Sequence, residues 1–262
     1  MYRIVEQNLR TAMRCYSSVG NGSEARDYPG VTISCSGMDV PVFNSAMLTE
    51  PARDIRPMIQ IADTHFTQRG FGWTFWLCED MIAPETRGSF TRAAFRNAGM
   101  TRIAEPPGMY ADRIKPASRP LAQLTFCAVD NERTRTEFAH IASIVFSLPF
   151  ETSKKIYGSA GLWQPPSYGW IGYFDEKPVC VATTVIANGV VGVYSLGTLP
   201  QHQGCGYGET ILRYAITEAQ RETGIEPTVL QATPQGLRLY LRMGFRIVTK
   251  FSIYAREGCD SF

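Results

Sequence analysis

The segment from Tyr194 to Glu209, YSLGTLPQHQGCGYGE, contains the residues of this chain that are best suited to chemistry. An apolar strand leads directly into Gly204, Gly206 and Gly208, and a helix follows. Glycine lets a backbone approach a ligand closely. The first N–H groups of a helix are unpaired and lie at the positive end of its dipole. The segment therefore predicts a cradle of backbone amides for a phosphate or pyrophosphate group.

Two familiar phosphate-binding loops do not account for this segment. A Walker A loop ends in Gly-Lys-Ser/Thr, whereas Gly208 is followed by Glu209 and Thr210. A dinucleotide fingerprint needs its third glycine one residue later and an acidic residue at the end of the next strand. That strand ends here in Gln231 and Ala232.

The loop instead resembles the signature of the GNAT acyltransferase superfamily, Gln/Arg-x-x-Gly-x-Gly/Ala. The residues QGCGYG, from Gln203 to Gly208, match its fixed positions. Downstream, the run LYLRMGF from Leu239 to Phe245 is similar to the second family motif, Leu-Tyr-x-x-x-Gly-Phe. The resemblance covers about residues 120 to 256. It implies direct transfer of an acetyl group from acetyl-CoA to an amine, which is either a small molecule or a peptide.

The resemblance also assigns site residues. Tyr240 corresponds to a tyrosine that lies near the thioester sulfur, where it would act as the acid for the leaving thiolate. A strand N–H near Leu196 would stabilise the oxyanion. No metal is implied. The residues expected to bind acetyl-CoA are Leu196, Gly197 and Thr198 on the strand and Gln203, Gly204, Cys205, Gly206, Tyr207, Gly208 and Glu209 on the loop and helix start.

The chain departs from the family pattern in two places. Many members have a glutamate on the strand that corresponds to Tyr194–Leu199, and no carboxylate occurs there. The sequence therefore does not identify the general base. At the exit of the next strand the usual asparagine is replaced by Thr233 and Pro234. A non-catalytic sensor or interaction module that binds acyl-CoA is the alternative function.

The elements expected around these residues define an α/β fold with a mixed sheet, arranged as two tandem GNAT-like domains, 1–116 and 117–262. A proline-rich segment, 104–120, separates them. Asn188-Gly189 predicts a hairpin turn, and Gly224 predicts the left-handed end of a helix. The expected strands are 121–129, 170–174, 178–186, 190–199, 228–232 and 245–255, and the expected helices are 131–148, 206–222 and 234–242, with a loop at 149–169.

The N-terminal half reads as a degenerate copy of the C-terminal one. Val40–Leu48, Asp54–Gln68 and Trp73–Leu77 predict its strand, helix and strand. Its phosphate-loop position, TEPARD, contains no glycine, and two carboxylates there would repel a pyrophosphate. Phe95 stands where the C-terminal half has Tyr240. The first 30 residues carry no clear signal. Only the C-terminal copy is therefore expected to bind acetyl-CoA and to catalyse the transfer.

Bulk properties restrict the partners. A net charge of +2 on 262 residues does not indicate a nucleic-acid partner, and no apolar run is long enough to span a membrane. We expect a cytoplasmic protein that is a monomer or a homodimer.

The seven cysteines, Cys259 included, are widely spaced and predict reduced thiols. The aromatic residues Tyr157, Trp163, Tyr168 and Trp170 predict either an acceptor pocket or hydrophobic cover for a helix. Tyr194 and Ser195 are expected to face opposite sides of their strand.

Overall fold

A computed structural model describes residues 1–256 of the chain. Within these residues the twelve strands form one continuous mixed sheet, in the order β1-β2-β3-β4-β12-β6-β11-β10-β9-β8-β7, with β5 paired to β12. The strands are β1 (Glu24–Tyr28), β2 (Val31–Cys35), β3 (Ser45–Leu48), β4 (Thr74–Cys78), β5 (Met100–Ala104), β6 (Pro107–Ala111), β7 (Thr125–Ala128), β8 (Ser167–Phe174), β9 (Lys177–Ala187), β10 (Val190–Thr198), β11 (Thr228–Gln231) and β12 (Arg246–Arg256).

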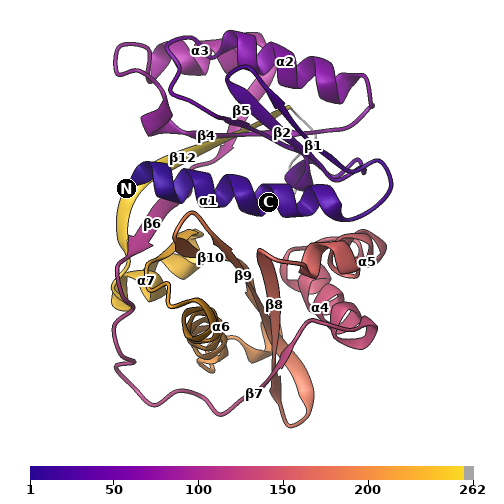
Figure 1. Cartoon of the computed structure of the whole chain (residues 1–262), viewed down its shortest axis with the longest axis vertical. Helices are drawn as coiled ribbons and strands as arrows, with labels where there is room; N and C mark the ends of the chain where they lie inside the picture. The colour runs from indigo at the N-terminus through magenta and orange to yellow at the C-terminus, as the bar shows by residue number, and fades with distance from the viewer. Residues whose placement is uncertain (257–262) are drawn as a thin grey trace.

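Seven α-helices cover this sheet within the same residues (Figure 1). In the C-terminal half, α6 lies on one face of the sheet and the pair α4 and α5 lies on the other. The N-terminal helix α1 lies between the two halves and contacts β6, β9, β10 and β11. The bounds are α1 (Tyr2–Cys15), α2 (Arg56–Thr67), α3 (Ser89–Asn97), α4 (Glu132–Val145), α5 (Phe150–Tyr157), α6 (Tyr207–Thr223) and α7 (Pro234–Arg242).

The two halves repeat one pattern of strands. In the C-terminal half β8, β9 and β10 pair antiparallel, and β10 then runs parallel to β11 after the α6 crossover. In the N-terminal half β1, β2 and β3 pair in the same way, and β3 runs parallel to β4 after the α2 crossover. The parallel pairs are equally short, because each joins only two residues on each strand. The tandem arrangement predicted from the sequence is thus visible in the topology.

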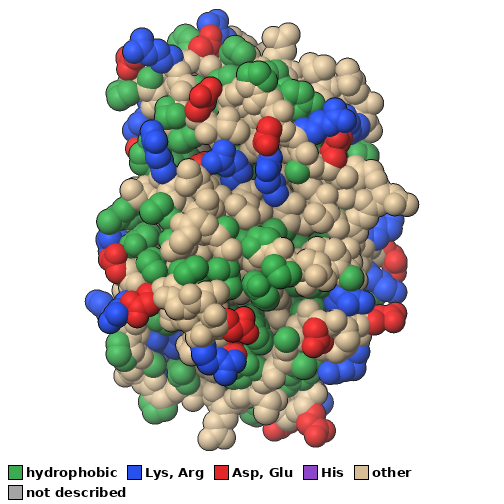
Figure 2. Space-filling view, in the orientation of Figure 1, with side chains coloured by type: hydrophobic (Ala, Val, Ile, Leu, Met, Phe, Trp, Pro, Cys, Tyr) green, Lys and Arg blue, Asp and Glu red, His purple; other side chains and the backbone are tan. Residues whose placement is uncertain are grey.

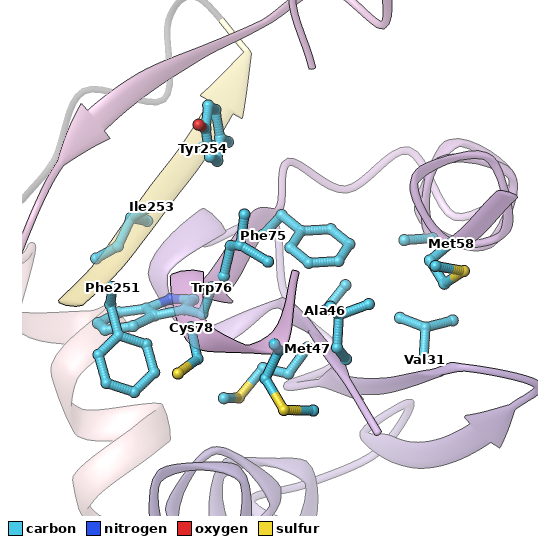
Figure 3. Packing of buried hydrophobic residues seen from close by; sticks show 14 of the residues in the cluster. Val31, Ala46, Met47, Met58, Phe75, Trp76, Cys78, Phe251, Ile253 and Tyr254 are labelled. Carbon is cyan, nitrogen blue, oxygen red and sulfur yellow. The ribbon is translucent and has the colours of Figure 1, made fainter. Parts of the chain in front are cut away.

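The halves also exchange strands. Strand β6 belongs to the N-terminal half of the sequence, but it pairs with β11 and with the first part of β12. The second part of β12 pairs with β4 and β5 in the N-terminal half. Figure 3 shows Phe251, Ile253 and Tyr254 of β12 in the same core as Phe75 and Trp76 of β4. The predicted boundary between residues 116 and 117 lies in the segment that joins β6 to β7.

Local signals in the sequence agree with the structure. Asn131 caps α4 through a reciprocal pair of bonds with Thr134. Gly224 ends α6 in the left-handed conformation, with φ of 70°. Asn188 and Gly189 both have positive φ in the β9–β10 turn. A helix over 234–242 was also predicted, and α7 has these bounds.

Three elements differ from the expectation. The loop predicted over 149–169 contains helix α5, and β8 already begins at Ser167. The proline-rich segment contains β6, which begins at Pro107, a position where the missing N–H of proline is tolerated. The N-terminal region, which gave no clear signal, contains α1. Its buried residues include Val5, Leu9, Ala12 and Met13, which recur at helical spacing.

Candidate active site

The glycine-rich loop leaves the start of α6 open. Gly204 and Gly206 have φ of 80° and 85°, in the left-handed region that glycine adopts without strain. Gly206 is the residue before the helix, and within residues 1–256 no side-chain cap is present at this helix start. The helix spans Tyr207–Thr223, so its dipole acts on this opening. These are the properties of an anion-binding helix start.

The corresponding helix start in the N-terminal half is closed. The Asp54 carboxylate accepts a hydrogen bond from the backbone N–H of Arg56 at 3.0 Å. The guanidinium of Arg56 pairs with the same carboxylate at 2.7 Å. A bound phosphate would have to displace this carboxylate and would be repelled by it. The structure thus gives a physical basis for the prediction that the N-terminal copy lacks a phosphate site.

Two charged side chains determine the electrostatics near the open loop. Glu209 is buried and pairs with Arg213 at 2.9 Å, so its charge is compensated within the first turns of α6. A methyl group built on Gly206 would lie 3.9 Å from a guanidinium nitrogen of Arg119. Sequence reasoning missed Arg119 because it lies in the linker, about 85 positions before the loop. Its position makes it a candidate phosphate ligand.

The remaining loop residues pack against the end of β10. The side-chain amide of Gln203 donates to the carbonyl of Thr198 at 3.3 Å. A methyl group on Gly208 would lie 3.4 Å from the Thr198 hydroxyl. Cys205 is exposed, and Tyr207 is buried beneath the loop. The predicted loop residues are therefore adjacent in space to the end of β10, where Gly197 and Thr198 lie.

Strands β10 and β11 diverge beside this loop. They pair at Val191 with Thr228 and at Gly192 with Val229, and the parallel pairing ends there. Strand β10 continues for six further residues, to Thr198. Unpaired backbone groups on the facing edges of two strands can bond to an extended ligand between them. Leu196, Gly197 and Thr198 lie on the part of β10 that is free of β11.

A β-bulge interrupts β10 at the expected reaction centre. Its register against β9 shifts between Tyr194 and Gly197, and Ser195 has a φ of 44°. The bulge turns neighbouring side chains to one face. Tyr194 donates to Asn8 of α1 at 2.6 Å, and Ser195 contacts Tyr16, which directly follows α1. The expectation that Tyr194 and Ser195 face opposite sides was wrong, because it assumed an unbroken strand.

Tyr240 lies on the opposite face of the sheet from α1. It is 7% exposed and packs in a core cluster that also includes Val193, Leu212 and Leu230, with Leu196 against it. Burial raises the pKa of Tyr240 to about 12. The phenol is therefore protonated at neutral pH. Leu196 packs against the same cluster, and the role that the family resemblance implies for Tyr240 stays a prediction.

The four aromatic residues predicted to line an acceptor pocket do not lie together. Tyr157 is buried in the cluster beneath α4 and α5, and Trp163 donates to its carbonyl at 2.7 Å. Trp170 lies on the α6 side, edge-on to Tyr214. Trp163 also covers Gly169 closely, so it serves as packing. Of the four residues, Tyr157 lies nearest to the proposed reaction centre, because its hydroxyl is 3.2 Å from that of Ser195.

Other parts of the described chain show fewer features of a functional site. Residues 1–256 contain no group of three potential metal ligands and no helix that could cross a membrane. A groove of about 480 Å³ lies between β1 and α2. Its Arg26 and Arg69 are already paired with Glu24. The described cysteines are free, and Cys259 lies outside the described residues.

Comparison with known proteins agrees with this geometry. Residues 165–247 match the model of the acetyltransferase (GNAT) domain. A GCN5-related N-acetyltransferase from Kribbella flavida has 19% identity and a TM-score of 0.69, covering 95% of each chain. A functionally unknown conserved protein from Staphylococcus epidermidis has 13% identity and a TM-score of 0.65, covering 90% of this chain and 94% of its own.

The tandem arrangement also has a counterpart among solved structures. A tandem GNAT protein from the clavulanic acid biosynthesis pathway has 11% identity and a TM-score of 0.52, covering 86% of this chain and 77% of its own. No curated protein matches the sequence significantly. The chain thus has the fold of solved GNAT proteins, and residues 165–247 match the GNAT acetyltransferase domain.

Proposed function

We propose that the protein is an N-acyltransferase that moves an acetyl group directly from acetyl-CoA to an amine. The observation that carries this proposal is the uncapped start of α6 beside the divergence of β10 and β11. The open amides and Arg119 suit a pyrophosphate, and the divergence suits the extended pantetheine arm. CoA is a substrate in this proposal, and these two features bind it without a metal.

The residues of this chain divide the work of the reaction. The amides from Gly204 to Glu209 hold the pyrophosphate, and the edge of β10 from Leu196 to Thr198 pairs with the pantetheine. This fixes the thioester beside the bulge, where an N–H near Leu196 stabilises the oxyanion. Holding both substrates together removes the need for a covalent enzyme intermediate.

Tyr240 supports the leaving group. Its phenol stays protonated because burial raises its pKa to about 12. A free thiol has a pKa of about 8.5, so full proton transfer from this phenol to the sulfur is uphill. Tyr240 therefore acts as a hydrogen-bond donor to the developing thiolate. The proton that finally resides on the sulfur comes from the nitrogen of the acceptor.

The proposal is tested by release of free CoA thiol from acetyl-CoA in the presence of a panel of amines. We expect release that depends on both the protein and the amine, with an acetylated amine as the second product by mass spectrometry. Binding of acetyl-CoA without any acetylated product would contradict transfer. The Gly206→Asp variant is the control, because it places a carboxylate beside the amides at the start of α6, as Asp54 does near the start of α2.

A second candidate function is a sensor that binds acyl-CoA without turning it over. It is favoured by one observation, the absence of a carboxylate on β10. A sensor would share the cradle and the β10 edge but would not depend on Tyr240. Binding of acetyl-CoA together with no product from any amine would support it.

A further inference from the structure

A group of hydroxyls meets at the bulge on the α1 face of the sheet. The Ser195 hydroxyl lies 3.1 Å from the hydroxyl of Tyr16 and 3.2 Å from that of Tyr157. Tyr16 follows α1, Tyr157 ends α5 and Ser195 lies on β10, so three separate parts of the chain form this group. Next to it the Tyr194 hydroxyl donates to Asn8. This face of the reaction centre is therefore polar without being charged.

The side-chain carboxamide of Gln231, on β11, lies on the same α1 face of the sheet. Gln231 is the last residue of β11, and its side-chain nitrogen is buried with no hydrogen-bond partner among the described residues. Val229, two positions earlier on β11, packs in the core on the α1 side, whereas Leu230 packs on the α6 side. Side chains alternate along a strand, so Gln231 faces the α1 side too. A buried donor of this kind favours a ligand with an acceptor atom.

The ionisable groups at this place are neutral at pH 7. Burial raises the pKa of Tyr16, Tyr157 and Tyr194, and it raises the pKa of Cys15 to about 11. The other influences on the three phenols come from hydroxyls and the Cys15 thiol, not from a carboxylate or a cation.

The charged side chains of the surrounding helices are engaged elsewhere. On α1, Glu6 pairs with Arg10 and Arg14 pairs with Asp27. On α4, Arg133 pairs with Glu137, and Arg135 donates to the carbonyl of Gly158. The charged residues of α5, which are Glu151, Lys154 and Lys155, are exposed. An ammonium ion that entered among these hydroxyls would lose its hydration and gain no counter-charge, which is costly.

From this arrangement we infer that the acceptor is an amine of low basicity, uncharged at pH 7 and attached to an aromatic ring. The inference rests on the proposed function. A neutral amine needs no base before it attacks, which agrees with the missing carboxylate. One side of the hydroxyl group is an aromatic wall, because the ring of Phe43 packs on those of Tyr16 and Tyr157, with centroids 4.9 Å and 6.0 Å away, and such a wall suits an amine that carries a ring.

The reaction then balances without an external acid or base. The lone pair of the amine nitrogen attacks the thioester carbon, so that a C–N bond forms and the C–S bond breaks. The electron pair of the C–S bond stays on sulfur. The proton lost by the nitrogen ends on that sulfur, and the products are an amide and free CoA thiol.

Two acceptors that differ in charge provide the test. Aniline is neutral at pH 7, whereas benzylamine carries the same ring and is an ammonium ion. With acetyl-CoA and the whole protein, we expect kcat/KM for aniline to exceed that for benzylamine at least tenfold at pH 7. Raising the pH should increase the benzylamine value in proportion to its neutral fraction and leave the aniline value nearly constant. A preference for benzylamine at pH 7 would overturn the inference.

The outcomes distinguish failure of the inference about the acceptor from failure of the proposed acyl transfer. Benzylamine as the better substrate contradicts the inference and leaves acyl transfer standing. If neither aniline nor benzylamine is acetylated but another amine of the panel is, the inference fails and acyl transfer stands. If acetyl-CoA binds and no amine of the panel is acetylated, both fail. Because acetyl-CoA binding is measured separately by calorimetry, a protein that has not folded is recognised before either conclusion is drawn.

A substitution at the bulge gives a second readout. Ser195→Asp supplies the missing carboxylate, and aspartate tolerates the positive φ of this position. We expect the ratio of kcat/KM for benzylamine over aniline to rise at least tenfold. Tyr16→Phe should raise KM for aniline without changing acetyl-CoA affinity. Tyr28→Phe removes a hydroxyl bonded to His65 on the N-terminal half and is the matched control. An unchanged substrate ratio in Ser195→Asp would contradict the assignment of this face.

Discussion

The hydroxyl of Tyr16 lies 3.1 Å from the hydroxyl of Ser195, although 179 positions separate the two residues in the chain. Tyr16 belongs to the N-terminal half, and Ser195 lies on the strand that borders the proposed acyl-CoA site. The N-terminal half therefore contributes directly to the surroundings of the proposed reaction centre. It does so through α1 and the turn after it, and not through a phosphate site of its own.

Arg119 is expected to strengthen the binding of CoA. Its guanidinium lies near Gly206, and a charge-assisted bond to a phosphate at this exposed position should change affinity roughly tenfold. Arg119→Ala should therefore raise the Kd for CoA by calorimetry and weaken its dependence on salt. Arg113 is another arginine of the linker, and it is paired with Glu226. Equal effects of Arg113→Ala and Arg119→Ala would show that only general charge matters.

Tyr240 is expected to affect turnover more than binding. Removing its hydroxyl by Tyr240→Phe should lower kcat about 100-fold, the usual lower range for loss of one hydrogen-bond donor to a developing negative charge, while the Kd for acetyl-CoA stays the same. Tyr214→Phe is the control, since that ring stacks on Phe126 at 3.9 Å and lies outside the proposed site. A Tyr240→Phe variant with full kcat would remove Tyr240 from the mechanism.

Glu6 should make stability depend on pH. Burial raises its pKa to about 7, although Arg10 lowers it. The folded value exceeds the unfolded one, so the contribution is fully favourable below the unfolded pKa and is lost as the pH rises to about 7. A shift of this size corresponds to at most about 3 kcal/mol. Glu6→Gln should therefore raise the free energy of unfolding at pH 8 relative to the native chain.

The same substitution should have little effect at pH 4.5, where the carboxyl is protonated in the folded state. Urea titrations of both chains at the two pH values measure the difference. A Glu6→Gln variant that is equally destabilised at both pH values would instead indicate that the ion pair with Arg10, at 3.4 Å, outweighs burial.

The strand exchange should make the two halves depend on each other for folding. Residues 117–262 lack β6, which lies between β11 and β12, and residues 1–116 lack β12, which pairs with β4. We expect each fragment alone to show little cooperative unfolding. Produced together, the fragments should associate and recover cooperative unfolding, followed by circular dichroism. A cooperative transition in 117–262 alone would contradict this dependence.

Features with local causes were predictable from the sequence. The Asn188-Gly189 turn and Gly224 were predicted correctly because positive φ is a property of single residues in turns. The bulge at Ser195 and the strand exchange of β6 and β12 were not predictable in this way, since they arise from contacts between residues far apart in the chain. Arg119 was missed for the same reason. For α1 the apolar spacing was present in the sequence and was overlooked.

The most direct test of the account is a calorimetric titration of the whole protein with acetyl-CoA, with Gly206→Asp and Gly224→Asp measured beside it. Both glycines have left-handed φ and flank α6, and Gly224→Asp should cost at least as much stability as Gly206→Asp, because its carboxylate lies at the negative end of the helix dipole. We predict one site per chain, at least 100-fold weaker in Gly206→Asp because a carboxylate would occupy the open amides, and unchanged in Gly224→Asp. No binding at millimolar acetyl-CoA, or equal binding by the native chain and Gly206→Asp, would contradict the central claim.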